Sequence, residues 1–354
     1  MKKLGIVIQG TTFMKAMMPL AIFANSVGVL PVLLLYRFRK GKTHDNLDHD
    51  RVYEIMKCMD LKFEAFIVSD ENDALRIMRK EKISNVVCQD AQHHGKVFCK
   101  THGLNVFSIS VFFDTLHYAN RVRLNHINYN HDMLPDAMYF PDKRFENDFK
   151  RLMSRDMSCN FISAGSPLFD HSLFIKKTPI DRSVCFLTTL QRLVDKTAQE
   201  DLEMFIDYCL KNKIQFIMKT KEKAPWKLKN KKLYSHVKIV KDEIGFPYTS
   251  LFLILNTDIH ISSYSTSACE SEYFGKPCIN LGSVEDKRLT YAVNSIKNEY
   301  NFNNLFNSQT CITSRSNIIE AYENLLSLKI EDKNNITMVD NNSIRILNDI
   351  SKRL

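Results

Sequence analysis

Short apolar runs alternate with longer amphipathic segments along most of the chain. In the first half, apolar runs of strand length occupy 4–8, 31–36, 63–68, 83–88, 106–113 and 137–140. Segments with helical spacing of their apolar residues lie between or after them, at 13–26, 48–59, 74–79 and 145–153. Continuous apolar strands joined by helices predict a parallel sheet that is covered on both faces. Right-handed crossovers then bring the carboxyl ends of the strands, and the loops after them, to one edge.

A second series with the same alternation follows a polar segment at 176–182. Its predicted strands are 183–187, 215–218, 237–240 and a run ending near 261, and its predicted helices are 195–211, 250–255 and 317–328. The first of these helices has an apolar stripe made of Ala198, Leu202, Phe205, Ile206, Cys209 and Leu210. We therefore expect an α/β, GT-B-like protein with two Rossmann-like, doubly wound domains facing a cleft. The expected bounds are 1–165, a linker at 166–182, 183–342, and a C-terminal helix at 343–354 that packs back on the first domain.

Length and composition predict a soluble globular protein with two domains. A chain of 354 residues favours two domains over one core, and 44% hydrophobic with 25% charged residues is typical of a soluble globular protein. The net charge of +9 indicates an anionic partner, or only a preference for lysine as the solubilising residue. Nine cysteines lack any Cys-x-x-Cys spacing and eleven histidines lack metal-ligand spacing. We expect reduced thiols, and neither a metal nor a cofactor.

The apolar segments do not predict a membrane span or a leader. The run at 4–8 is too short for a signal peptide, and the region 17–36 is interrupted by polar residues, Gly28 and two prolines. A spanning helix needs about 20 mainly apolar residues. We expect a cytoplasmic protein. The lysine-rich run 221–232 around Trp226 is read either as a solvated loop or as a surface for the anionic inner leaflet of the membrane. No nucleic-acid-binding module is recognisable, so nucleic acid is not an expected partner.

The stretch 261–281 carries the strongest chemical signal. Hydroxyl residues surround a predicted helix start that follows a buried strand, namely Ser262, Ser263, Ser265, Thr266 and Ser267. Unpaired backbone N–H groups and the positive end of the helix dipole make such a start a place for phosphate. Glu270 follows Thr266 by four positions, so both side chains rise on one face of the helix. The alternative is a capping box in which Ser267 is the N-cap and Glu270 its N3 partner.

With Gly275-Lys276-Pro277 and a strand after it, this stretch resembles the donor-binding motif of GT-B-fold enzymes. These include nucleotide-sugar glycosyltransferases, UDP-N-acetylglucosamine 2-epimerases, CDP-glycerol glycerophosphotransferases and related surface-polysaccharide transferases. The resemblance implies that Ser265, Thr266 and Ser267 hold the diphosphate of the donor and that Glu270 holds its ribose. The hydroxyl turn replaces the glycine turn of the epimerases, which favours a transferase.

Weaker matches follow the order of the same families. Gly165-Ser-Pro-Leu-Phe-Asp170 resembles their interdomain Gly-x-Pro-x-x-Asp turn. Thr189 and Arg192, in Thr188-Thr189-Leu-Gln-Arg192, resemble the loop after the first strand of their second domain, and Lys219 resembles a lysine that ends a later strand. Lys219 lacks the His-Pro that often follows it in those families. Gly10 and Thr11 form a turn after the first strand whose counterpart faces the diphosphate.

The first domain is expected to hold the acceptor and a general base. Candidates follow two of its strands: Asp90, His93 and His94 after one, and Asp114 after the next. Histidine is a frequent base because its pKa lies near neutral pH, although any of these residues is also explained as a hydrogen-bonded loop residue. His94-Gly95 resembles the His-Gly of the glycerophosphotransferases.

Together, these expectations predict one function. We expect a metal-independent glycosyltransferase that moves a sugar from a nucleotide-sugar donor to a glycan or lipid-linked acceptor for the cell surface. The alternatives are a CDP-glycerol-type glycerophosphotransferase and a non-catalytic nucleotide-sugar-binding partner of a polysaccharide assembly complex. An epimerase is a third alternative.

Overall fold

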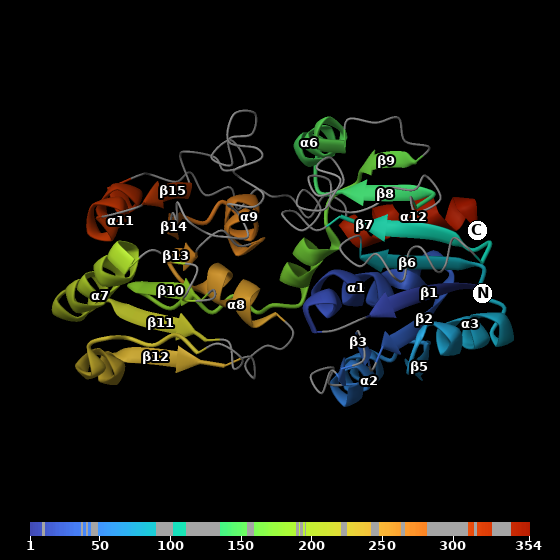
Figure 1. The fold of residues 1–354 in the computed structure, drawn as a ribbon, viewed down its shortest axis with the longest axis horizontal. Helices are drawn as coiled ribbons and strands as arrows, with labels where there is room; N and C mark the ends of the chain where they lie inside the picture. Colours follow the sequence, from blue (N-terminus) through green and yellow to red (C-terminus); the bar gives the residue numbers. More distant parts are fainter. Residues whose placement is uncertain are drawn as a thin grey trace. The chain divides into compact units, whose positions relative to one another are not determined.

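The computed structural model divides the chain into two compact units (Figure 1). Unit 1 comprises Met1–Leu173 and Met338–Leu354, and unit 2 comprises Phe174–Thr337. The residues that the structure describes are 1–8, 11–36, 38–39, 42–43, 49–89, 102–110, 135–153, 159–188, 191, 194, 196–220, 225–241, 248–262, 266–281, 311–314, 317–327 and 341–354.

Unit 1 is built on a parallel sheet with the strand order β5-β2-β1-β6-β7-β8-β9. The strands are β1 (Lys2–Ile8), β2 (Val29–Tyr36), β5 (Glu64–Val68), β6 (Asn85–Gln89), β7 (Asn105–Ile109), β8 (Ala137–Phe140) and β9 (Asn160–Ser163). The helices are α1 (Thr11–Ala24), α2 (His49–Cys58), α3 (Glu71–Lys80), α6 (Lys143–Met153) and α12 (Asn342–Arg353). Short pieces complete the unit: β3 (Phe38–Arg39), β4 (Lys42–Thr43), η1 (Asn25–Val27) and η3 (Pro167–Leu173). The strand order reverses between β1 and β6.

Unit 2 repeats this plan with the strand order β12-β11-β10-β13-β14-β15, again parallel. Its strands are β10 (Ser183–Leu187), β11 (Gln215–Lys219), β12 (Val237–Val240), β13 (Ile259–Ser262), β14 (Cys278–Leu281) and β15 (Cys311–Ser314). Its helices are α7 (Lys196–Lys211), α8 (Thr249–Asn256), α9 (Thr266–Tyr273) and α11 (Ile318–Ser327), with η5 (Lys231–His236) before β12. Here the strand order reverses between β10 and β13, so ligands of such a sheet are expected at the carboxyl ends of these two strands.

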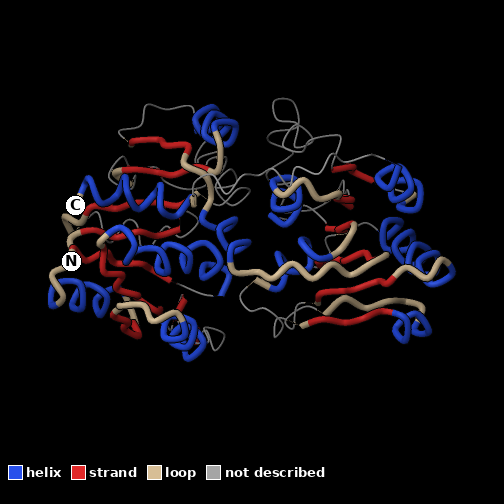
Figure 2. Tube along the Cα trace, turned by 180° about the vertical axis from the view of Figure 1, so that it is seen from behind, coloured by secondary structure: helices blue, strands red, loops and turns tan. Residues whose placement is uncertain are grey.

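Two apolar layers hold unit 2 together. Helices α7 and α11 cover one face of the sheet, where Phe205 and Tyr322 pack against Phe216 and its neighbours. Helix α8 covers the other face through Leu253 and Ile254. Helices therefore lie on both sides of the strands, as continuous apolar strands require (Figure 2).

The segment 225–228 is anchored in the core of unit 2. Trp226 and Leu228 are buried, and the Trp226 ring meets Phe186 edge to face with centroids 4.9 Å apart. Lys229 forms an ion pair with Glu200 at 2.6 Å. The lysines within 227–232 are exposed, as the interpretation of a solvated run requires, whereas the indole of Trp226 contributes a large apolar area to the core.

The C-terminal helix α12 belongs to unit 1, where it packs beside α1. Asp170 is buried and accepts hydrogen bonds from the backbone N–H groups of Asn342 (3.1 Å) and Ser343 (2.6 Å) at the start of this helix. Asn341 provides a further cap by accepting from the N–H of Ile344. Asp170 thus satisfies helix N–H groups that would otherwise be unpaired.

Several predicted boundaries need correction. Thr11 lies in the first turn of α1 and not in a turn before it. Leu210 is exposed and does not belong to the buried stripe of α7. Strand β11 extends one residue beyond the predicted 215–218, to Lys219, and Asn317 lies before α11 and caps it by accepting from the N–H of Glu320. Across the helices that the structure describes, none combines the length and the apolar character needed to cross a membrane.

Candidate functional site

The carboxyl edge of the sheet in unit 2 presents two buried hydroxyl groups beside the reversal of strand order. Thr188 follows β10 directly, and its N–H donates to the carbonyl of Lys219 at 3.1 Å, which fixes it at the edge. Ser262 ends β13, the strand that pairs with β10. Within the described part of the chain, neither Thr188 Oγ1 nor Ser262 Oγ has a hydrogen-bond partner. A buried hydroxyl without a partner is costly, so each of these groups is a candidate to bind a polar ligand.

Helix α9 begins just after this edge. It starts at Thr266, so Ser267 lies inside the helix and not at the N-cap position that the alternative of a capping box with Glu270 requires. Ser267 and Glu270 are both buried, at 6% and 4% exposure. Lys219, at the end of β11, is also buried. The edge therefore combines a helix N-terminus, hydroxyl groups and a lysine, which are groups that bind phosphate.

The inner face of α9 rests on polar side chains of the sheet. Ile259 and Ile261 belong to the layer under α7 and α11, so the alternating residues His260 and Ser262 face the opposite side. Asn280 is the register partner of Ser262 and lies on that same side. His260 Nδ1 and Ser271 Oγ, on α9, lie 2.5 Å apart. Burial lowers the pKa of His260 to about 3, so its imidazole is neutral at ordinary pH.

Gly275-Lys276-Pro277 ends α9 and starts β14. Gly275 has a left-handed φ of +63°, which suits the residue after a helix. The N–H of Lys276 donates to the carbonyl of Ser271 at 2.8 Å, and the carbonyl of Pro277 accepts from the N–H of His260 at 3.0 Å. The motif therefore closes the helix and aligns β14 beside β13.

A comparable group lies at the carboxyl edge of the sheet in unit 1. Gln89 ends β6, next to the reversal of strand order, and its side chain is 2% exposed. Among the described residues, neither the nitrogen nor the oxygen of the Gln89 amide has a hydrogen-bond partner. Cys88 packs in the apolar cluster of α3, so Gln89 projects to the other face of the sheet. Sequence reasoning passed over Gln89 because it was counted with the loop that follows it.

Several predicted site residues lie outside the described residues. They are Asp90, His93, His94 and Asp114 among the candidate bases, and Gly10, Thr189, Arg192 and Ser265 among the donor-binding residues. Thr11 and Thr266 lie in the first turns of α1 and α9, and their side chains are outside the description. Of the predicted set, the structure brings Ser267, Glu270 and Lys219 into unit 2 near the carboxyl edge. Ser262, from the hydroxyl cluster of the sequence, lies at the same edge, and the structure adds Thr188; both hydroxyl groups are buried without a partner among the described residues.

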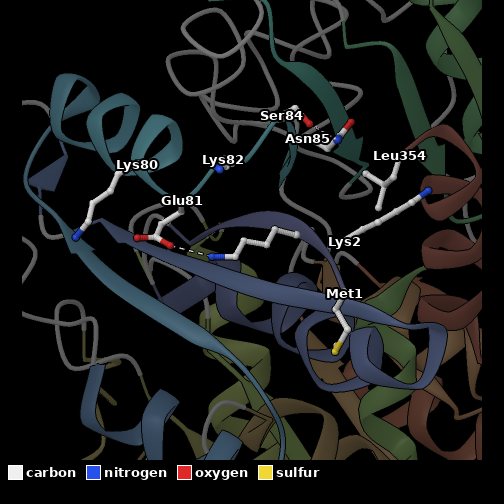
Figure 3. Close-up of a pocket in the computed structure, with 9 residues that line it drawn as sticks. Met1, Lys2, Lys80, Glu81, Lys82, Ser84, Asn85 and Leu354 are labelled. Atoms are coloured by element: carbon white, nitrogen blue, oxygen red, sulfur yellow. Dashed lines mark hydrogen bonds and ion pairs between the residues drawn. The ribbon is translucent and has the colours of Figure 1, made fainter.

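A depression of about 470 Å³ lies elsewhere, at the amino edge of the sheet in unit 1 (Figure 3). Lys2 and Lys3 line it from the start of β1, and Ser84 and Asn85 from the start of β6. Lys3 forms ion pairs with Glu64 and Glu81, both at 2.8 Å, and its hydrogen bonds to these carboxylates raise its pKa. Because ligands of parallel sheets bind at the carboxyl edge, this depression is not part of the candidate site. In the portion of the chain covered by the description, no three His, Cys, Asp or Glu side chains gather as metal ligands.

Each unit contains a parallel, doubly wound sheet in which the strand order reverses beside the first strand, which is β1 in unit 1 and β10 in unit 2. Two such units in one chain define a GT-B fold. Solved structures match this fold over nearly the full length of both chains. The UDP-GlcNAc 2-epimerase from Methanocaldococcus jannaschii is 14% identical with a TM-score of 0.65, covering 99% of this chain and 100% of that one. The UDP-GlcNAc 2-epimerase from Neisseria meningitidis, bound to UDP-GlcNAc, is 13% identical with a TM-score of 0.61 and the same coverage.

A third match comes from a transferase. The glycotransferase of kitacinnamycin is 8% identical with a TM-score of 0.59, covering 99% of each chain. No protein-family model and no curated protein sequence matches the chain. The likeness in structure therefore establishes the GT-B fold, and the activity has to be argued from the site.

Proposed function

We propose that the chain is a glycosyltransferase that moves a sugar from a nucleotide-activated donor to a growing cell-surface glycan. The observation that carries this proposal is the pair of buried hydroxyl groups of Thr188 and Ser262 at the carboxyl edge of unit 2. Together with the N-terminus of α9, they provide donors for the oxygens of a diphosphate. The solved epimerase structures support a nucleotide sugar, because the N. meningitidis protein holds UDP-GlcNAc and the M. jannaschii protein holds UDP-GlcNAc and UDP.

Each residue of the edge has a role in this proposal. Thr188, Ser262 and the N–H groups of α9 bind the diphosphate, while Glu270 accepts a hydrogen bond from the ribose. Lys219 neutralises charge on the leaving diphosphate. Removing one donor to such a charge typically costs about 3 kcal/mol in the barrier. We expect transfer to proceed without a metal ion, so EDTA should leave the rate unchanged.

The proposed reaction joins the acceptor to the donor sugar. An acceptor oxygen forms a bond to C1 of the sugar, the bond from C1 to the diphosphate oxygen breaks, and the nucleoside diphosphate leaves with that electron pair. A base takes the proton of the acceptor hydroxyl. His94, Asp114, Asp90 and His93 remain the predicted candidates for that base, and all of them are in unit 1 of the chain.

Gln89 supports an acceptor site in unit 1. Its buried amide offers one donor and one acceptor group, which suits the hydroxyl groups of a sugar. Gln89→Leu keeps a similar volume and removes both groups. It should lower the rate of transfer while leaving the affinity of unit 2 for a nucleoside diphosphate unchanged.

A second candidate is a UDP-GlcNAc 2-epimerase, because two of the three structures compared above carry that activity in their names. The sequence of the turn before α9 favours the transferase, since serine and threonine stand there in place of glycines. A CDP-glycerol-type glycerophosphotransferase uses the same kind of edge and differs in the bond that breaks. A cytoplasmic location, with the acceptor at the inner face of a membrane, accompanies the transferase proposal.

Products separate these functions in one experiment. The purified chain is incubated with UDP-, GDP- and CDP-sugars and with CDP-glycerol, together with lipid-linked acceptors. Release of a nucleoside diphosphate with sugar on the acceptor supports the transferase, whereas release of CMP supports glycerophosphate transfer. Inversion at C2 of UDP-GlcNAc supports the epimerase. Binding without turnover supports a non-catalytic partner, and absence of both binding and turnover overturns the proposal.

A further inference from the structure

Helix α9 is unusual in how it is held on the sheet of unit 2. Its eight residues include three that are buried and polar: Ser267, Glu270 and Ser271. The strand residues on the side that it covers are also polar and buried, namely His260, Ser262 and Asn280. A helix that packs through polar groups is held by specific hydrogen bonds, because apolar contact area contributes little there.

His260 makes a hydrogen bond that links the strand to the helix. Its side chain is 1% exposed, and its Nδ1 lies 2.5 Å from Ser271 Oγ. Its Nε2 has no hydrogen-bond partner among the residues that the structure describes. The imidazole therefore contacts α9 through one nitrogen, and that nitrogen faces the residue next to Glu270.

The same strand connects His260 to the phosphate edge. Ser262 follows His260 by two positions and projects from the same face of β13. On the helix, Ser271 follows Ser267 by four positions, so these two residues share the face that rests on the sheet. The His260–Ser271 hydrogen bond thus ties the helix that carries Ser267 and Glu270 to the strand that carries Ser262.

We propose that His260 is a positioning residue that holds α9 through Ser271 and thereby sets the placement of Glu270 relative to Ser262. This proposal rests on the proposed function for its effect on nucleotide binding, and it stands on the structure alone for its effect on the helix. The competing explanation is that His260 only fills space in the core.

Two substitutions separate these explanations because they imitate different nitrogens of the ring. His260→Asn places an amide atom near the position of Nδ1, so it keeps a partner for Ser271. His260→Gln places its amide atom near Nε2 and leaves Ser271 without its partner. Ser271→Ala removes the other half of the bond with the loss of a single oxygen atom.

Two readouts are needed. The first is the hydrogen-exchange rate of the backbone amides of α9 in the ligand-free full chain. Ser271→Ala and His260→Gln should accelerate exchange about tenfold, and His260→Asn should stay near wild type, as expected for one hydrogen bond. The second is the dissociation constant for UDP by calorimetry, which should rise about tenfold in the same two variants. Their effects should not add in the double variant, because both remove one interaction.

Thr257→Val is the matched control. Thr257 Oγ1 is buried and donates to the carbonyl of Leu253 on α8 and to Cys185 Sγ on β10, so its loss lowers stability through hydrogen bonds to α8 and β10. It should leave both the exchange rates of α9 and the UDP affinity unchanged. Equal effects of His260→Asn and His260→Gln, or unchanged exchange in Ser271→Ala, would overturn the positioning role. If exchange changes as expected but wild type binds no nucleotide, the proposed function fails and the positioning role stands.

Discussion

Gly165 lies so close to Asn342 that a Cβ atom at Gly165 would stand 1.9 Å from Asn342 Oδ1. Asn342 begins α12, and its side-chain nitrogen donates to the carbonyl of Ser166 and to Asp170 Oδ1. Gly165 and Asp170 are the first and last residues of the Gly-x-Pro-x-x-Asp turn. Within unit 1, this turn is therefore a docking site for the start of the C-terminal helix.

Gly165→Ala should destabilise the chain by about 3 kcal/mol, because the new methyl group displaces Asn342 and because φ is +89°. The measurement is the midpoint of urea unfolding. Gly28→Ala is the control: Gly28 also has a positive φ, +74°, but a Cβ there would meet nothing within 4 Å. It should cost about 1 kcal/mol. Equal costs in the two variants would show that the contact with Asn342 is unimportant.

The free energy of unfolding should fall as the pH falls below 6.5. Burial lowers the pKa of His171 and of His260 to about 3, from 6.5, so the unfolded chain binds protons that the folded chain does not. Each histidine contributes at most about 1.4 kcal/mol per pH unit between these values, with stability lost on acidification. His260→Asn should reduce the slope by about one proton, measured by urea unfolding from pH 4 to 7. A slope unchanged in this variant would contradict a neutral, buried His260.

Removal of either unpartnered hydroxyl group at the edge of unit 2 should raise the stability of the fold and weaken nucleotide binding. Thr188→Val and Ser262→Ala each remove a buried hydroxyl that lacks a partner in the described part of the protein. We expect each to raise the free energy of unfolding by up to about 1 kcal/mol and to weaken nucleoside diphosphate binding about tenfold. Thermal unfolding and calorimetry measure the two quantities.

Ser108→Ala is the control for these two variants. Ser108 is also buried, and its hydroxyl has no partner among the described residues, but it lies on β7 in unit 1. Ser108→Ala should raise the free energy of unfolding by a similar amount and leave the nucleotide affinity unchanged. If Thr188→Val and Ser262→Ala lowered the free energy of unfolding and left nucleoside diphosphate affinity unchanged, the two hydroxyl groups would stabilise the fold and would not bind the ligand.

Much of the fold was predictable because short continuous apolar runs indicate buried strands. The predicted strands 137–140, 183–187 and 237–240 coincide with β8, β10 and β12. Errors occur where a polar residue is buried or an apolar one is exposed. Buried Lys219 extends β11 one residue beyond the predicted 215–218, and Leu210 is exposed although it follows the apolar spacing of α7.

The site was less predictable because its signal depends on partners. Sequence identifies hydroxyl residues near the start of α9, but it does not show which of them are buried without a hydrogen bond. Thr188 and Gln89 are recognised as buried polar residues only when the neighbouring strands are placed beside them. Likewise, the Ser271–His260 bond joins residues eleven positions apart through the packing of helix on sheet.

The central claim is that the carboxyl edge of unit 2 binds the diphosphate of a nucleotide, and nucleotide titration tests it most directly. UDP, UMP and uridine, with GDP and CDP for comparison, are titrated into wild type and into Glu270→Ala by calorimetry. At least one nucleoside diphosphate should bind wild type about a hundredfold more tightly than the matching nucleoside, since the edge recognises phosphate. Glu270→Ala should weaken that binding about tenfold, because the ribose loses a charged acceptor. Equal binding of diphosphate and nucleoside, or unchanged affinity in Glu270→Ala, would contradict the assignment of the site.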